Sequence, residues 1–532
     1  MNKKLEIKRP EDYLSVFWHR VQAGGKPMAG AALLSALISA LVAYHLLIIT
    51  GHGNPDAVCE GLVCYSGADW ALACGRWATR YMNELSGNVI IPGLWVLLYA
   101  LCCGFTTIIL SRLWKIESKL SICLISVLLT VNPTVIEQSL LQYMFMAWGI
   151  SNLVGALFVY LCCTDGHWSR KYLLAPLCMA VAFGLYQACV SMMCLCFCIT
   201  LILKLMDGDS LKDMLITVFK FALSALVGVV LYFGIMELEI IRYGVDESSR
   251  VDEFSLMGIL GSLPQSFPNA YKTFFAYFVD HRFWRTRLYV LLFAIAFGFA
   301  LWALIKLVKK RRILEALAAV LLAALIPAFS NISDIIFPYN IPVLIMQYQS
   351  MLVVPFSLAL IHRADLELPQ LANLSRIVAS LLLAALAWGY IVAANTTYRV
   401  YELTYRNTYF TVSAVLEEIY DLPGYSEDEV IAFAGYPSDS YLRNNIDAYK
   451  QAYGQYENLV FWPGVMGLQN CRQNYLLNYF GIDGGYIRGG WYNDAVRSEE
   501  FKAMPVWPAE GSIQRINELI IVKFEENPPI FD

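Results

Sequence analysis

A short polar segment near the N-terminus carries the residue types needed for acid–base chemistry on a charged substrate. It holds carboxylates, guanidinium groups and tryptophans, namely Asp56, Glu60, Asp69, Glu84, Arg76, Arg80, Trp70 and Trp77. A carboxylate can accept the proton of an acceptor hydroxyl, and a cation can stabilise a departing phosphate. The pattern favours group transfer from a phosphate leaving group. The alternative is a solvated loop whose charges form surface ion pairs.

A second polar segment, residues 237–286, adds basic groups close to an apolar stretch. Arg250 and Arg282 are the candidates there for binding a substrate phosphate, and His281 and Arg285 lie beside Arg282. Basic side chains at a membrane interface can bind a lipid phosphate. Snorkelling of long side chains toward water explains their position equally well.

These polar segments must be positioned by membrane-spanning helices. The chain is 58% apolar and 15% charged, against about 45–50% and about 25% in soluble domains. Its apolar residues gather in stretches near the ~20 residues that cross a bilayer. We therefore predict about eleven spans, at residues 28–50, 90–111, 120–138, 142–162, 172–186, 188–206, 214–236, 287–305, 313–330, 341–361 and 374–394.

Charges in the short connections orient this bundle. Basic residues recur in the connections of one face: Arg20, Lys26, Arg112, Lys115, Lys119, Arg170, Lys171, Lys306, Lys309, Lys310, Arg311, Arg312, Arg363 and Arg376. The positive-inside rule makes this face cytoplasmic. Residues 1–27 are then a cytoplasmic N-terminal segment, residues 28–394 form the bundle, and the loops 51–89 and 237–286 lie outside.

Residues 395–532 have mixed polar and aromatic composition and are predicted to form an extracytoplasmic domain. An amphipathic helical pattern covers Tyr401–Tyr420, and strand-like runs occupy Val430–Phe433 and Leu519–Phe524. Helix followed by separated strands indicates an α/β domain. The predicted fold class is thus an α-helical polytopic membrane protein with a C-terminal extracytoplasmic α/β domain.

Several functional classes find no support in the sequence. The net charge is −4 and no basic patch is interleaved with aromatic residues, so nucleic acid is not an expected partner. No His/Cys cluster has the spacing of a zinc site. Asp207-Gly208-Asp209 matches an Asp-x-Asp metal motif but falls on the predicted cytoplasmic face, where we interpret it as a turn. No metal or other cofactor is expected, although a divalent metal stays possible.

Three short motifs resemble one family. Asn54–Arg76, read as N-P-D, Y-S-G-A-D-W and G-R-W, resembles the first outer loop of the bacterial serotype-converting (O-antigen) glucosyltransferases, which are polytopic enzymes of the GT-C class. Gly184–Ala188 (G-L-Y-Q-A) resembles the recurrent Y-Q-A segment of that family. Met504–Pro508 is similar to the C-terminal ends of Gram-positive members.

The resemblance implies a GT-C-like bundle in the bacterial cell membrane. It further implies transfer of glucose or a similar hexose from a polyprenyl-phosphate carrier in the membrane lipid to a cell-surface glycan on the outer face. Asp56 is then the general base. Many relatives have paired aspartates where this chain has Asn54-Pro55 before one Asp, so Glu60 and Asp69 remain rivals.

Within or just after these motif segments lie the candidates for substrate binding, against the alternative that Arg76 and Arg80 form structural ion pairs with Glu84 or Asp69. Arg76 and Arg80 are candidates for the carrier phosphate because arginine can bind phosphate with two hydrogen bonds. Tyr186 and Gln187 are candidates for substrate contact, although a buried glutamine also satisfies backbone groups. The alternative function is a transporter or flippase of lipid-linked sugars. A flippase places charges near the bilayer midplane, whereas nearly all charges here map to loops and span ends.

Overall fold

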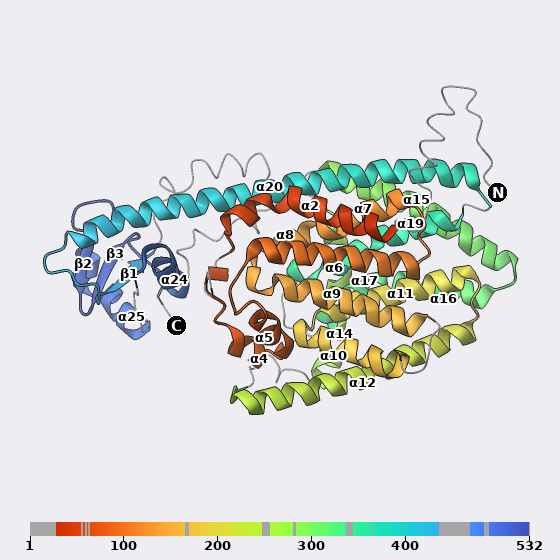
Figure 1. The fold of residues 1–532 in the computed structure, drawn as a ribbon, viewed down its shortest axis with the longest axis horizontal. Helices are drawn as coiled ribbons and strands as arrows, with labels where there is room; N and C mark the ends of the chain where they lie inside the picture. Colours follow the sequence, from red (N-terminus) through yellow and green to blue (C-terminus); the bar gives the residue numbers. More distant parts are fainter. Residues whose placement is uncertain are drawn as a thin grey trace, which may run out of the picture.

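Most of the chain is helical in the computed structural model (Figure 1). The structure describes residues 28–54, 57–58, 61, 64–164, 170–246, 256–279, 283–336, 344–364, 367–435, 469–482 and 489–530. Four predicted site residues, Asp56, Glu60, Arg250 and Arg282, lie outside the described residues. The motif residues Asp69 to Trp77 and Gly184 to Ala188 lie within them.

Seven described helices are long and apolar enough to cross a membrane. They are α2 (Met28–Thr50), α6 (Pro92–Leu113), α9 (Gln142–Cys163), α11 (Cys189–Asp207), α12 (Leu211–Tyr243), α15 (Phe283–Lys309) and α20 (Pro369–Tyr420). An eighth span results if α7 (Lys119–Thr130) and α8 (Pro133–Leu140), which meet at a bend of 41°, are counted together. The chain is therefore a polytopic membrane protein.

The predicted count of eleven spans is not confirmed. Within the predicted spans, α10 covers only Ala175–Leu185 after a π-helical turn, Arg170–Leu174. The predicted span 313–330 is divided into α16 (Ile313–Ala324) and α17 (Ile326–Ser330), and α19 (Val353–Arg363) follows 3-10 turns at Leu344–Met346 and Tyr348–Leu352. Prolines in the first turns of α8 and α17 explain the break between α7 and α8 and the break between α16 and α17. Proline cannot donate the backbone hydrogen bond that continues a helix.

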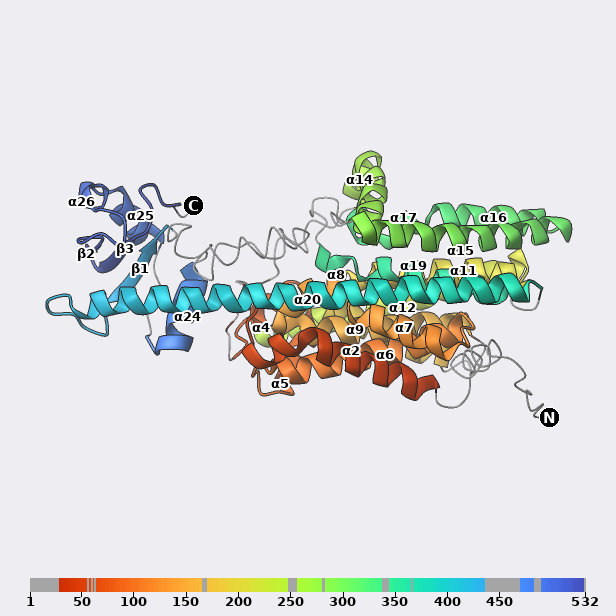
Figure 2. The same ribbon diagram turned by 90° about the horizontal axis from the view of Figure 1, so that it is seen from above.

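Helix α20 is longer than a membrane is thick. Its 52 residues measure about 78 Å at ~1.5 Å per residue, against a hydrocarbon core of about 30 Å. It packs against α2, α7 and α15 and then runs past the end of the bundle toward the C-terminal strands (Figures 1 and 2). The domain boundary predicted at residue 395 falls inside this helix, which continues through it.

A small three-stranded sheet follows α20. Both predicted strand-like runs are strands: β1 (Val430–Ala434) pairs in parallel with β3 (Leu519–Lys523), and β2 (Ile513–Ile516) pairs antiparallel on the other side of β3. All five residues of the central strand β3 are buried. Helices α24 (Gln469–Phe480), α25 (Gly489–Arg497) and α26 (Glu499–Ala503) lie in the same part of the chain.

Basic residues from several connections meet at one end of α11. Asp207 forms ion pairs with Lys115 at 2.8 Å and with Arg363 at 2.8 Å, and Asp209 forms one with Lys204 at 3.0 Å. Gly208 between them has a φ of +110° and ends the helix, so this Asp-x-Asp segment is a turn, as predicted. Helices α4 (Ala68–Ala73) and α5 (Trp77–Glu84) of the polar segment lie at the opposite end of the bundle, on the side of the sheet (Figure 1).

Candidate active site

Helix α5 is held between the α10–α11 turn and the end of α12. The Thr79 hydroxyl donates to the Leu185 carbonyl at 3.3 Å. The Tyr81 hydroxyl donates to the Glu239 carboxylate at 2.6 Å, and Arg242 donates to the Tyr81 oxygen at 3.1 Å. The hydrogen bond to Glu239 raises the pKa of Tyr81 to about 12. The polar segment is thus a folded element docked on the bundle rather than a solvated connector.

The turn between α4 and α5 is built around Gly75. Its φ is +76°, and a Cβ at this position would lie 2.4 Å from the Tyr232 hydroxyl and 2.9 Å from the Gln187 amide nitrogen. The Gln187 amide donates to the Cys74 carbonyl at 2.7 Å, and the Tyr232 hydroxyl donates to the Gly75 carbonyl at 3.0 Å. Only glycine combines this backbone conformation with such close approach.

Arg76 and Trp77, which follow Gly75, also contact the segment that contains Gly184 and Tyr186. The Arg76 guanidinium carbon lies 5.3 Å from the centre of the Tyr186 ring, which is a cation–π distance. A Cβ on Gly184 would lie 2.4 Å from Trp77, so the missing side chain of Gly184 makes room for the indole. The motifs G-R-W and G-L-Y-Q therefore interlock residue by residue, and we call Gly75, Arg76, Trp77, Gly184, Tyr186 and Gln187 the motif interlock.

A buried carboxylate lies near the motif interlock. Glu137, on α8, is within electrostatic reach of the Tyr186 hydroxyl. Its Oε2 atom and the Nε atom of Arg76 are both buried without a hydrogen-bond partner among the described residues. The Trp148 ring packs edge-on against Tyr186 at 5.6 Å. Tyr186 thus connects the Arg76 guanidinium and the Trp148 ring, with the Glu137 carboxyl group in electrostatic range.

The two predicted phosphate-binding arginines have different surroundings. Arg80 pairs with Asp69 at 3.2 Å and with Glu84 at 3.5 Å, and its guanidinium lies 3.5 Å from the centre of the Tyr243 ring. No carboxylate of the described residues pairs with Arg76. Asp69 is 74% exposed on its side chain. Arg80 and Asp69 are therefore occupied with each other, whereas Arg76 still has the capacity to bind an anion.

The described residues on either side of position 56 are anchored to the bundle and to α24. The Asn54 amide donates to the Leu140 carbonyl at 3.0 Å, and the Asn54 side chain accepts from the Ala57 amide at 3.1 Å. Asn474 of α24 donates to the Val58 carbonyl at 2.9 Å. Asn54 and Val58, the described residues on either side, are consequently held by Leu140 at the end of α8 and by Asn474 of α24.

His52, just after α2, is part of the same anchoring. Its ring stacks on Tyr405 with the centres 4.1 Å apart, and the Tyr405 hydroxyl donates to the Gly53 carbonyl at 2.9 Å. Burial lowers the pKa of His52 to about 4, although Glu402 acts in the opposite direction. The imidazole is therefore neutral at pH 7 and serves as a packing surface between α2 and α20.

Two residues of this region were not among the sequence candidates. Glu137 follows Asn132-Pro133 inside an apolar stretch, and an acidic residue after a helix break within a membrane is a functional signal. Trp148 carries no such signal, because a tryptophan in an apolar helix looks like any other core residue. Gln187 is placed in the motif interlock, where its amide holds the turn that precedes Arg76.

The arrangement is suited to binding an anion beside a ring-shaped group. Arg76 supplies a positive charge that no carboxylate pairs with in the part of the chain that the structure describes, and the Tyr186 ring lies beside it. A partly buried guanidinium is costly unless an opposite charge joins it. A phosphate is one of the anions that arginine binds through paired hydrogen bonds.

Comparison with known proteins identifies the family. The family model described as Glucosyl transferase GtrII matches residues 60–356, more than half of the 532-residue chain. This range contains the whole motif interlock but neither Asp56 nor the C-terminal sheet. No curated protein and no solved structure matches. The resemblance found in the sequence is confirmed, and the chain belongs to the GtrII glucosyl transferase family, whose activity is glycosyl transfer.

Proposed function

We propose that this membrane glycosyltransferase moves glucose or a similar hexose from a polyprenyl-phosphate carrier to a cell-surface glycan on the outer face of a bacterial membrane. Family membership supports the hexosyl transfer. The observation that carries the choice of donor is Arg76, a partly buried cation next to Tyr186 with no carboxylate partner among the described residues. In this proposal the shorter helices α10, α16 and α19 complete a GT-C-like bundle.

Arg76 binds the carrier phosphate in this proposal. The negative charge on the phosphate grows as its bond to the sugar breaks, so a fixed cation stabilises the transition state more than the ground state. The buried Tyr186 ring lies under the Arg76 guanidinium and holds it in place, and the half-buried Trp77 ring offers an apolar face to the hexose. Gln187 and Gly75 act indirectly, because they fix the turn that presents Arg76.

Asp56 is the general base of the proposed reaction. Its carboxylate accepts the proton of the acceptor hydroxyl while that oxygen bonds to the anomeric carbon. The bond between the anomeric carbon and the phosphate oxygen breaks, and the polyprenyl phosphate leaves with both electrons. Glu60 remains an alternative base. Asp69 is the weaker rival because its carboxylate is exposed and paired with Arg80.

The proposed sidedness is supported by the two ends of the bundle. One end gathers the basic residues Lys115, Lys204 and Arg363, as expected for a cytoplasmic face. The motif interlock and the C-terminal sheet lie toward the other end (Figures 1 and 2). The N-terminal segment is then cytoplasmic, and the site and the C-terminal part of the chain face outward.

The test uses the full-length protein in lipid nanodiscs, supplied with polyprenyl-phosphate glucose and surface glycan extracted from the producing cells. We expect Asp56→Asn and Arg76→Ala each to reduce hexosyl transfer about 100-fold or more, the loss typical of removing one transition-state contact. Arg406→Ala is the matched control, because Arg406 also lies over an aromatic ring, at 5.8 Å from Phe410, but is exposed on α20 and belongs to no part of the motif interlock.

Two outcomes would overturn the proposal. Full transfer activity in Arg76→Ala would remove the arginine from phosphate binding. Movement of labelled polyprenyl-phosphate glucose across vesicle membranes, without transfer to glycan under any condition, would instead support a flippase.

A further inference from the structure

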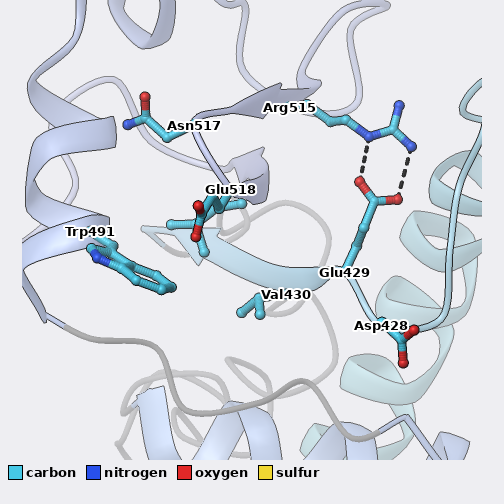
Figure 3. A pocket seen from close by; sticks show the side chains of 8 residues that line it. Asp428, Glu429, Val430, Trp491, Arg515, Asn517 and Glu518 are labelled. Atoms are coloured by element: carbon cyan, nitrogen blue, oxygen red, sulfur yellow. Dashed lines mark hydrogen bonds and ion pairs between the residues drawn. The ribbon is translucent and has the colours of Figure 1, made fainter.

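A cleft of about 360 Å³ opens at one edge of the C-terminal sheet (Figure 3). Six polar or aromatic residues that line it come from three separate stretches: Asp428, Glu429, Trp491, Arg515, Asn517 and Glu518. In Figure 3, Trp491 stands on one side of the cleft and the Glu429–Arg515 pair on the other, with Glu518 and Val430 between them. The cleft belongs to no part of the site described above.

The walls of the cleft are held by local structure. Arg515 of β2 forms a two-bonded ion pair with Glu429, with one of the bonds at 2.9 Å, and donates to the Pro423 carbonyl at 2.9 Å. This pair lowers the pKa of Glu429 to about 2, so both groups stay charged at every physiological pH. Asn517, with a φ of +55°, forms the tight turn between β2 and β3 together with Glu518. Such a turn favours asparagine.

The lining has the chemistry of a carbohydrate site. Trp491 is 40% exposed and offers an indole surface suited to the apolar face of a sugar ring. The carboxylate and guanidinium groups across the cleft, and the Asn517 amide on the same side as Trp491 (Figure 3), can donate and accept hydrogen bonds with hydroxyl groups. This combination of an aromatic wall with a few convergent polar groups is typical of small-molecule sites.

The charge of the cleft narrows the ligand class. Asp428, Glu429 and Glu518 contribute three negative charges, and Arg515 contributes one positive charge. A carrier phosphate or a uronic-acid glycan would meet net repulsion here. A neutral saccharide carries no such penalty, because its hydroxyl groups can donate to the carboxylates.

The location of the cleft suits the acceptor rather than the donor. The sheet lies beyond the end of the bundle that carries α4 and α5 (Figures 1 and 2), outside the ~30 Å that the lipid core occupies. The C-terminal part of the chain also contacts the neighbourhood of Asp56, through the hydrogen bond from Asn474 to Val58. An acceptor chain held at the sheet is therefore on the same side as the motif interlock.

We propose that the cleft lined by Trp491, Glu429, Arg515, Asn517 and Glu518 binds a neutral segment of the acceptor glycan. Assigning that glycan as the acceptor rests on the proposed function. The cleft raises the local concentration of the acceptor at the outer face and does not take part in bond breaking. Its loss therefore weakens acceptor binding and leaves the turnover rate at saturation unchanged.

The experiment measures binding and transfer separately on the full chain in lipid nanodiscs, which contain no sugar-based detergent. The probe is surface polysaccharide extracted from the producing cells and divided by anion exchange into a neutral and an acidic fraction. We expect the neutral fraction to bind, Trp491→Ala to weaken binding about tenfold, and Trp491→Phe to restore most of it. Glu518→Lys provides a second test that reverses one charge of the cleft, and it should shift preference toward the acidic fraction.

The control is Glu510→Gln, which removes an exposed carboxylate on the loop before β2 and should bind like the wild-type protein. In transfer assays, Trp491→Ala should raise the KM for glycan about tenfold with kcat unchanged. Equal binding of the neutral fraction by wild type and Trp491→Ala, or an unchanged KM with active enzyme, would overturn the inference and leave the proposed function standing. Trp491-dependent binding by a protein that transfers no hexose would support the glycan-binding cleft and overturn the proposed function.

Discussion

Replacing Gly75 with alanine tests whether the motif interlock positions Arg76. The backbone at Gly75 has a φ of +76°, and the added Cβ would lie 2.4 Å from the Tyr232 hydroxyl and 2.9 Å from the Gln187 amide nitrogen. Both distances are shorter than any ordinary carbon contact, so these side chains must move. Their hydrogen bonds to the Gly75 and Cys74 carbonyls are the contacts that would be lost.

The cost has two parts. A non-glycine residue in the left-handed region costs about 1–2 kcal/mol, and the two hydrogen bonds contribute about 1 kcal/mol each. The sum is a loss of about 3–4 kcal/mol of stability. Arg76 follows directly, and misplacement of a binding group by about 1 Å reduces turnover about 100-fold. We therefore expect Gly75→Ala to be less stable and to transfer hexose about 100-fold more slowly.

Gly87 provides a matched control. Its φ is +65°, but a Cβ there would meet no atom within 4 Å. Gly87→Ala therefore carries the backbone strain alone, about 1–2 kcal/mol, and should keep its activity. The measurements are thermal unfolding in nanodiscs and the rate of hexosyl transfer for both variants. Equal activity of the two variants would refute the role of the Gly75 turn in placing Arg76.

Two further predictions concern the elements around the site. Tyr81→Phe removes the hydroxyl that donates to Glu239 at 2.6 Å; we expect a loss of about 1 kcal/mol and faster amide hydrogen exchange in α5, and unchanged exchange would contradict the docking of α5 on α12. For His52, the folded pKa of about 4 lies below the unfolded value of ~6.5, so the unfolded chain binds more protons between these pH values. Stability should fall by about 3 kcal/mol as the pH drops from 6.5 to 4. His52→Gln should lack this part of the pH dependence. If the melting temperatures of the variant and the wild type changed equally with pH, burial would not be what keeps the ring neutral.

Much of the architecture follows from local sequence. The spans at 28–50, 90–111 and 142–162 correspond to α2, α6 and α9 within a few residues, because about 20 consecutive apolar residues match the length of helix that crosses a bilayer. The strand-like runs Val430–Phe433 and Leu519–Phe524 are strands for the same kind of reason, since their β-branched and apolar residues favour a pleated conformation. Arg76 and Tyr186 were found as candidates through motifs of a few residues each.

Local sequence did not determine how those segments are divided or joined. The apolar run 120–138 looks continuous, yet Asn132 caps a new helix and Pro133 begins it. The change of composition near residue 395 suggests a domain boundary, yet one helix crosses it. In both places the pattern of apolar residues indicates whether a segment lies in lipid or in water. The backbone conformation depends instead on single capping residues and on packing against α2, α7 and α15.

The relation between the two motifs was decided by the tertiary structure alone. Sequence analysis named Arg76, Tyr186 and Gln187 as separate candidates, and the fold brings them together although Cys74 and Gln187 are 113 positions apart. No local period encodes such a contact. It arises because Gly75 and Gly184 leave room for the side chains of the opposite segment, and complementarity of that kind exists only once the helices are packed. The sequence by itself determined which side chains are available at this membrane surface, and packing determined that, among the described residues, Arg80 is paired with carboxylates whereas Arg76 is not.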